Sequence, residues 1–135
     1  MKYFSDSVEK TFAIAKELAD TLIGGEVILL NGQLGAGKTT FTKGLAKALG
    51  IEKTVKSPTF TIMKSYQGKF TLVHFDMYRL EDQSDTYELG FEDVFNDNNS
   101  VFVIEWNKFT SFNNKVITVD INYVSENVRE IEITR

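Results

Sequence analysis

Three glycines, a lysine and a threonine stand at fixed spacing between residues 32 and 39 of this 135-residue chain. The stretch Gly-Gln-Leu-Gly-Ala-Gly-Lys-Thr matches the pattern G-x-x-x-x-G-K-[ST] at every specified position. A polyphosphate is held by backbone N–H groups, so the chain must wrap closely around it with φ values that favour glycine. Lys38 supplies a positive charge for the β- and γ-phosphates, and the Thr39 hydroxyl suits Mg²⁺. The motif therefore predicts a site for a nucleoside triphosphate with magnesium.

The residues on either side of this phosphate loop support the interpretation. An apolar run from Glu26 to Asn31 is typical of a strand buried on both faces, and a helix is expected from Lys38 to about Leu49, closed by Gly50. That helix would direct its N-terminal dipole at the anion. This context favours a phosphate loop over a glycine-rich turn with an incidental Lys-Thr pair. The candidate nucleotide-binding residues are Gly32, Gln33, Leu34, Gly35, Ala36, Gly37, Lys38, Thr39 and Thr40, the last reaching the α-phosphate.

Two acidic residues end apolar strands and are candidates to complete the site. Asp76 follows Val-His-Phe, and Glu105 follows Val-Phe-Val-Ile. Magnesium needs oxygen ligands, and a carboxylate at a strand end commonly helps to hold it. We favour Glu105 for the metal and Asp76 for the metal or the attacking water; with Lys38 these are the candidate catalytic residues. The sequence leaves their division of roles open, and either acid alone could simply cap a strand end.

Two neighbours of these acids have more than one interpretation. His74 shares a strand face with Asp76 and could act as a base, although a hydrogen-bonded core histidine is commoner. Trp106 follows Glu105 and is expected in the core or at a partner contact, with stacking on a nucleotide base as the alternative.

Hydrophobic periodicity predicts one α/β domain over residues 1–135, with a mixed central sheet flanked by helices and a β-rich C-terminal half. Its strand order does not follow from the sequence. The expected first helix is capped by Asp6, with Glu9 completing a capping box, and ends at Gly24-Gly25. The remaining expected elements are strands over 60–66 and 70–75 around a turn at 67–69, a helix over 86–95, and strands over 101–106, 116–121 and 129–134.

Composition excludes several classes of protein. The chain has no cysteine, no apolar run of the roughly 20 residues that a membrane helix needs, and no signal-like start. A cytoplasmic protein is therefore expected, with no membrane association. Residues 1–69 hold ten lysines against six acids, whereas residues 70–135 hold five basic and thirteen acidic side chains. The pI near 5.0 argues against independent nucleic-acid binding. The seven acids between Glu81 and Asp97 form either a solvated surface or one for a basic partner.

The motif set narrows the kind of nucleotide enzyme. Asn107-Lys108-Phe109-Thr110 lacks the aspartate that reads guanine, and no glycine follows Asp76 three residues on, so a GTPase is not expected. A small-molecule kinase usually needs an arginine-rich lid, and this chain has three arginines in all. Such a phosphotransferase stays the alternative, and a nucleotide-gated binding module without useful hydrolysis is a third possibility.

Beyond the phosphate loop, several stretches resemble the TsaE (YjeE) family in order and spacing. They are Ser57-Pro58-Thr59-Phe60-Thr61, His74-Phe75-Asp76-Met77-Tyr78-Arg79-Leu80, Glu88-Leu89-Gly90-Phe91-Glu92-Asp93 and Ile104-Glu105-Trp106. The family usually has Asp where this chain has Gln33 and Pro where it has Asn107, and neither change removes a phosphate or metal ligand.

The resemblance implies a weak Mg-ATP hydrolase that works with the TsaB and TsaD proteins, and through them on tRNA, in threonylcarbamoyladenosine synthesis. It implies phosphate and magnesium binding by Lys38 and Thr39, with Glu105 and Asp76 completing the site. It also implies switch-like hydroxyls at Ser57, Thr59 and Thr61, and an adenine-side position for Thr11. Since no arginine finger is apparent, we expect slow hydrolysis that partner proteins stimulate.

Overall fold

A seven-stranded mixed sheet forms the centre of the computed structural model, which describes residues 1–33, 35–56, 58, 62–78, 92–109 and 111–135. The strand order is β1-β7-β6-β2-β5-β4-β3. In chain order the strands are β1 (Lys2–Ser5), β2 (Val27–Asn31), β3 (Met63–Tyr66), β4 (Thr71–Asp76), β5 (Ser100–Glu105), β6 (Val116–Ser125) and β7 (Val128–Thr134). The described helices are α1 (Val8–Ala19), α2 (Lys38–Ala48) and the short 3₁₀ helix η1 (Glu92–Asn96).

The middle of the sheet is parallel and its margins are antiparallel. β2 pairs in parallel with both β5 and β6, and β4 pairs in parallel with β5. β3 is added beside β4, and β7 and β1 beside β6, as antiparallel strands. Because parallel strands end at one edge of a sheet, the residues that follow β2, β4 and β5 come together there.

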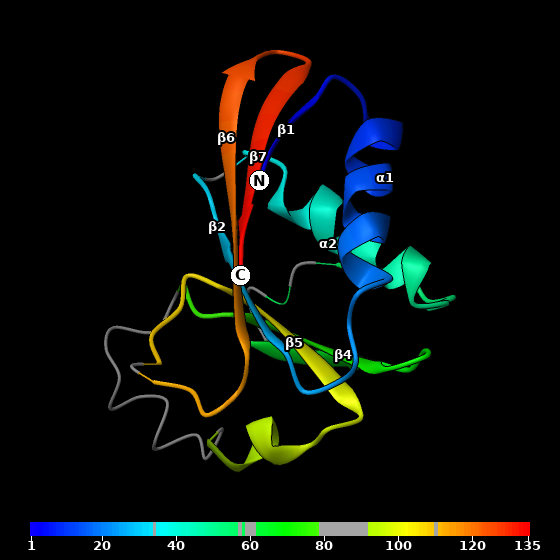
Figure 1. Cartoon of the computed structure of the whole chain (residues 1–135), viewed down its shortest axis with the longest axis vertical. Coiled ribbons are helices and arrows are strands. Elements are labelled where there is room, and N and C mark those ends of the chain that lie inside the picture. The colour runs from blue at the N-terminus through cyan, green and yellow to red at the C-terminus, as the bar shows by residue number, and fades with distance from the viewer. Residues whose placement is uncertain (34, 57, 59–61, 79–91, 110) are drawn as a thin grey trace.

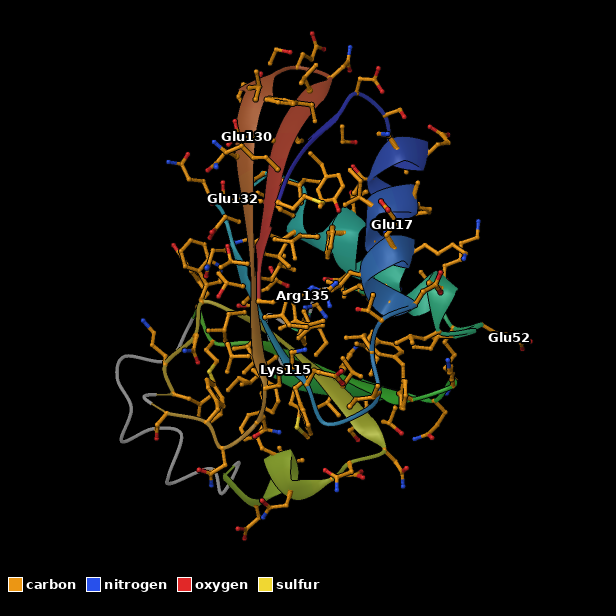
Figure 2. The ribbon with its side chains drawn as sticks, viewed as in Figure 1. Glu17, Glu52, Lys115, Glu130, Glu132 and Arg135 are labelled. Atoms are coloured by element: carbon orange, nitrogen blue, oxygen red, sulfur yellow. The ribbon has the colours of Figure 1, made fainter. Side chains whose placement is uncertain are left out.

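The two faces of the sheet are covered differently. α1 and α2 pack on one face, where they enclose an aliphatic core that includes Leu18, Ile28 and Leu45 (Figure 1). The helices can approach closely because Gly44 has no side chain; a Cβ there would lie 2.9 Å from the Cβ of Ala15. On the opposite face lies a cluster of five phenylalanines, Phe75, Phe95, Phe102, Phe109 and Phe112. In Figure 2, charged side chains such as Glu17 and Glu52 point outward from the helical layer.

The start and end of the first helix differ from the sequence prediction. Ser7, not Asp6, is the N-cap, and its side chain accepts a hydrogen bond from the Lys10 N–H. The helix ends at Ala19, several residues before Gly24-Gly25, whose positive φ values belong to the turn into β2. The sequence prediction also missed β1, because this four-residue strand depends on pairing with β7, more than a hundred residues away.

The other predicted elements agree more closely with the structure. The expected strands at 26–31, 70–75 and 101–106 correspond to β2, β4 and β5, and α2 ends one residue before Leu49. The C-terminal pair is antiparallel, and β6 extends further than predicted, to Ser125. Of the helix expected over 86–95, residues 86–91 lie outside the described residues, and the rest forms η1 instead of an α-helix. No helix within the described ranges has the length and apolar character needed to span a bilayer.

Candidate functional site

The predicted phosphate loop connects β2 to α2 at the edge where the parallel strands end. Gly32, Gly35 and Gly37 have φ values of 157°, 79° and 110°. A side chain at Gly32 would place its Cβ 2.7 Å from the carbonyl oxygen of Ile121, so conformation and space both require glycine there. The Ala36 N–H binds the Gln33 carbonyl at 3.0 Å, and Lys38 is the first residue of α2. The strand, loop and helix are therefore arranged as the motif requires, with Leu34 outside the described residues.

Lys38 is buried inside this loop. Its Nζ donates to the Gly32 carbonyl at 2.6 Å and lies 4.0 Å from Glu105 Oε1. The same ammonium sits 3.9 Å from the centre of the Trp106 ring. Burial lowers the pKa of Lys38 below its ordinary value, while the negative charges of Glu105 and Asp76 oppose this shift. The structure thus holds a partly desolvated cation where the motif predicts phosphate.

The two candidate acids are direct neighbours. Asp76 and Glu105 are paired residues at the ends of β4 and β5, and the Met77 N–H binds the Glu105 carbonyl at 3.0 Å. Both side chains are buried, and Asp76 Oδ1 accepts from the Tyr78 N–H at 3.0 Å. The strand-end acids predicted from sequence are therefore brought together, beside Lys38.

His74 contacts Glu105 from the adjacent strand. The imidazole is fully buried, and its Nε2 is 2.5 Å from Glu105 Oε2. Since an ionised carboxylate can only accept, this arrangement assigns the proton to Nε2. Among the described residues, the buried Nδ1 has no hydrogen-bond partner. His74 is thus the buried, hydrogen-bonded histidine of the commoner interpretation, and its contact orients one of the two candidate acids.

The donor set fits magnesium brought in with a polyphosphate better than a metal held by protein alone. No group of three or more His, Cys, Asp or Glu side chains suited to a metal ion occurs in the described part of the chain. Two carboxylates and the Thr39 hydroxyl border the loop instead, and Mg²⁺ usually combines one or two carboxylates with waters and substrate phosphates.

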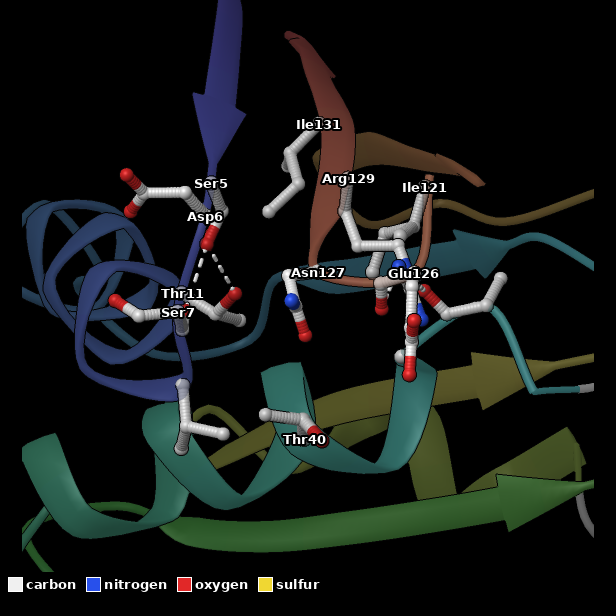
Figure 3. Close-up of a pocket in the computed structure, with 13 residues that line it drawn as sticks. Ser5, Asp6, Ser7, Thr11, Thr40, Ile121, Glu126, Asn127, Arg129 and Ile131 are labelled. Carbon is white, nitrogen blue, oxygen red and sulfur yellow. Dashed lines mark hydrogen bonds between the residues drawn. The ribbon is translucent and has the colours of Figure 1, made fainter. Parts of the chain in front are cut away.

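A cavity of about 180 Å³ lies beside the loop and contains both threonines predicted to face the nucleotide. Thr40 projects from α2 and Thr11 from α1 (Figure 3). The Thr11 hydroxyl is fixed by a 2.7 Å hydrogen bond to Ser5, at the end of β1. The cavity is also lined by Asn127 and Arg129 from the β6–β7 hairpin, which sequence reasoning missed. No local motif marks those residues, because only the sheet order brings the C-terminal hairpin to the loop.

Trp106 follows Glu105 and lies beside Lys38. Trp106 adopts an uncommon positive φ of 55°, and its ring meets Lys38 on one side and the edge of Tyr78, 5.0 Å away, on another. The switch candidates Ser57, Thr59 and Thr61 lie outside the described residues. Ile62, which follows them, accepts a hydrogen bond from the Asp76 N–H at 2.8 Å. The residue that follows that segment is therefore bonded to the backbone of a candidate acid.

Comparisons with known proteins point to one family. A family model described as "Threonylcarbamoyl adenosine biosynthesis protein TsaE" matches residues 5–131. The chain is 48% identical over 107 residues to the tRNA threonylcarbamoyladenosine biosynthesis protein TsaE of Bacillus subtilis, covering 78% of this chain and 66% of the relative. It is 35% identical to the protein of the same name from Treponema pallidum, covering 98% of this chain and 99% of the relative.

A solved structure shows the same architecture. The crystal structure of YdiB from Bacillus subtilis superposes with a TM-score of 0.77 at 35% identity, covering 97% of this chain and 82% of that one. The phosphate loop, the paired acids and the agreement of family model, relatives and fold lead to one conclusion: this chain belongs to the TsaE family.

Proposed function

We propose that this protein binds Mg-ATP and hydrolyses it slowly, as the ATPase that works with TsaB and TsaD in threonylcarbamoyladenosine modification of tRNA. The observation that carries the proposal is the convergence of Lys38, Glu105 and Asp76 at one end of the phosphate loop. The pathway is inferred from the names of the relatives, and nucleotide binding is inferred from the phosphate loop.

The loop and the cavity beside it bind different parts of the substrate. Backbone N–H groups of residues 32–39 and the Lys38 ammonium bind the phosphates, while the nucleoside occupies the cavity lined by Thr11 and Thr40. Lys38 contacts the Gly32 carbonyl and the Trp106 ring. Transfer of this ammonium to the β- and γ-phosphates replaces those contacts with charge-assisted ones. Nucleotide binding would therefore change the surroundings of the Trp106 ring, because the Lys38 ammonium moves away from it.

Hydrolysis needs an oriented water and neutralised charge. Magnesium, when bound, would supply positive charge that offsets the negative charge developing on the phosphate oxygens. Thr39, Asp76 and Glu105 are the residues that would hold this ion. His74 fixes the Glu105 carboxylate through its Nε2–H, which leaves the other carboxylate oxygen facing Lys38. The paired acids are thus the residues that would hold the metal and orient the attacking water, with Glu105 favoured for the metal.

We attribute slow turnover by the isolated protein to Arg129, which among the described residues is the arginine that contacts the loop. Arg129 donates to the carbonyls of Ala36, Ser125, Glu126 and Val128, so its guanidinium is engaged with backbone. An additional cation in this reaction class contributes roughly 10³–10⁵ in rate. TsaB and TsaD, in a cytoplasmic complex, are the proposed source of that stimulation.

Two measurements test the proposal. Depletion of the protein in its host should lower threonylcarbamoyladenosine in bulk tRNA, and restoration with the Lys38→Ala variant should not recover it. Purified protein should release free phosphate from ATP slowly, and faster when TsaB and TsaD are added. An unchanged nucleoside level would remove the pathway assignment, and transfer of the γ-phosphate to a metabolite would favour the kinase alternative.

A further inference from the structure

The β6–β7 hairpin is connected to the phosphate loop by one side chain. Arg129, half-buried on β7, donates from Nε to the Ala36 carbonyl oxygen at 3.0 Å. Its Nη1 donates to the carbonyls of Ser125, Glu126 and Val128 at 2.8, 3.3 and 3.1 Å. The Tyr123 ring lies beneath the guanidinium, 4.7 Å from its central carbon. The guanidinium is thus fixed by the hairpin, and its remaining edge holds one carbonyl of the loop.

The position of that carbonyl determines where the next amide points. The Ala36 carbonyl and the Gly37 N–H belong to a single planar, trans peptide unit, so they point in opposite directions. An Ala36 oxygen drawn toward Arg129 therefore turns the Gly37 N–H away from the hairpin. Among the described residues, the Gly37 N–H donates no hydrogen bond, whereas the preceding Ala36 N–H is occupied by Gln33. Gly37 is also the N-cap of α2, so its amide lies at the positive end of the helix.

The Ala36–Gly37 peptide rotates about ψ of Ala36 and φ of Gly37, and glycine at the second position eases that rotation. Gly35 and Gly37 have φ values of 79° and 110°, and glycine populates several backbone conformations about equally. A loop with this freedom needs an outside contact to hold one orientation before phosphate arrives. Ala36 is buried, and Arg129 provides such a contact with a donor that its neighbours keep in place.

We propose that Arg129 is a positioning residue, which holds the Ala36–Gly37 peptide so that the Gly37 N–H is directed at the phosphates. It acts on the phosphates through the loop backbone and not by direct contact with them. The inference rests on the proposed function, since it requires that the loop bind phosphate. It adds a task for the C-terminal hairpin, which carries none of the motifs that identify the loop.

The first test measures phosphate binding by calorimetry with magnesium pyrophosphate and with Mg-ADP. Arg129→Met keeps the apolar stem and removes every donor, and it should weaken both ligands by about tenfold, the size expected for one hydrogen bond to a charged group. Arg135→Met is the matched control, because Arg135 is exposed and contacts Thr21 far from the loop, and it should bind like the unmodified protein. If the unmodified protein binds neither ligand, the proposed function fails. If it binds both and Arg129→Met binds equally well, only the present inference fails.

The second test separates positioning from direct contact and from loss of folding. In a ¹⁵N-labelled sample, pyrophosphate should move the Gly37 amide resonance, and this movement should shrink in Arg129→Met. The Phe41 N–H is bonded to the Gly37 carbonyl at 3.0 Å. Its resonance should be the same in Arg129→Met and in the unmodified protein, which would show that the start of the helix is intact. A full Gly37 response with weakened binding would overturn the inference, because it would mean that Arg129 touches phosphate itself.

Substitution of Tyr123 tests the support of the Arg129 guanidinium more mildly. Tyr123 is 62% exposed, so Tyr123→Ala removes the support beneath the guanidinium with little effect on folding. We expect pyrophosphate affinity to fall about threefold, and Tyr123→Phe, which keeps the ring, to restore it. Equal affinities for Tyr123→Ala and the unmodified protein, together with an unchanged Arg129→Met, would exclude the positioning role.

Discussion

The two faces of the central sheet have opposite chemical character although they share the same strands. Along β4, Leu72, His74 and Asp76 point to the face covered by α1 and α2, whereas Val73 and Phe75 point to the phenylalanine cluster. The helical face ends in buried charges at the phosphate loop. The phenylalanine face contains rings with centroids 4.9 to 5.8 Å apart.

Strand alternation explains how one segment serves both purposes. Neighbouring residues point to opposite faces, so a shift by one residue would exchange His74 and Asp76 for Phe75 and Met77. The phenylalanine face therefore contributes packing that depends on the register, while the helical face carries the charged groups of the site. Mutations on the two faces should therefore separate stability from nucleotide binding.

The largest expected effect is on the phenylalanine face. Phe95 contacts the rings of Phe75, Phe102, Phe109 and Phe112, so Phe95→Ala should lower the free energy of unfolding by about 3–5 kcal/mol. Urea denaturation measures the loss, and calorimetry at low temperature should give an ATP affinity within about twofold of the unmodified protein. A large loss of affinity in the folded variant would show that the two faces are not separable.

Lys38→Ala should weaken ATP binding strongly while changing stability little. Removal of this ammonium leaves the phosphates without their main protein cation, so ATP affinity should fall more than about a hundredfold, or about 3 kcal/mol. The midpoint of urea unfolding should change little, because burial already disfavours the charge. Lys43→Ala, at an exposed position on α2, is the control and should alter neither quantity. Tight ATP binding by Lys38→Ala would contradict the site.

Glu105→Gln should lower the rate of ATP hydrolysis while leaving ATP affinity nearly unchanged. Gln keeps the size of the side chain and can still accept from His74, but it lacks the charge that would hold magnesium or activate water. We expect phosphate release in the presence of TsaB and TsaD to fall about a hundredfold, with ATP affinity changed about threefold or less. Full retention of tRNA modification by this variant, with loss in Lys38→Ala, would instead support the nucleotide-gated binding module.

The smallest expected effect is at the nucleoside cavity. Thr11→Val removes one hydroxyl that Ser5 holds beside the cavity, and should weaken ATP about threefold while leaving pyrophosphate unchanged. Thr11→Ser, which restores the hydroxyl, should recover most of the affinity. An equal loss for ATP and pyrophosphate would place Thr11 in the phosphate site and not beside the nucleoside.

The structure also shows which predictions could be made locally. The phosphate loop, α2 and β2 followed from residues close together in sequence, because glycine conformations, helix starts and buried strands have short-range causes. Asp76 and Glu105 were found as strand ends. The first helix was misplaced at both ends. β1 was missed because this short strand depends on pairing with β7.

The amino-acid sequence by itself determined the phosphate loop, the acids that end two strands, and membership of a family that carries both. Only the tertiary structure decided that His74 binds Glu105, that Trp106 covers Lys38, and that Arg129 holds the loop. The physical reason is the separation in sequence over which each feature is determined. Backbone conformation and burial pattern depend on a few neighbouring residues. Contacts between residues 31 to 93 positions apart depend instead on which strands lie side by side.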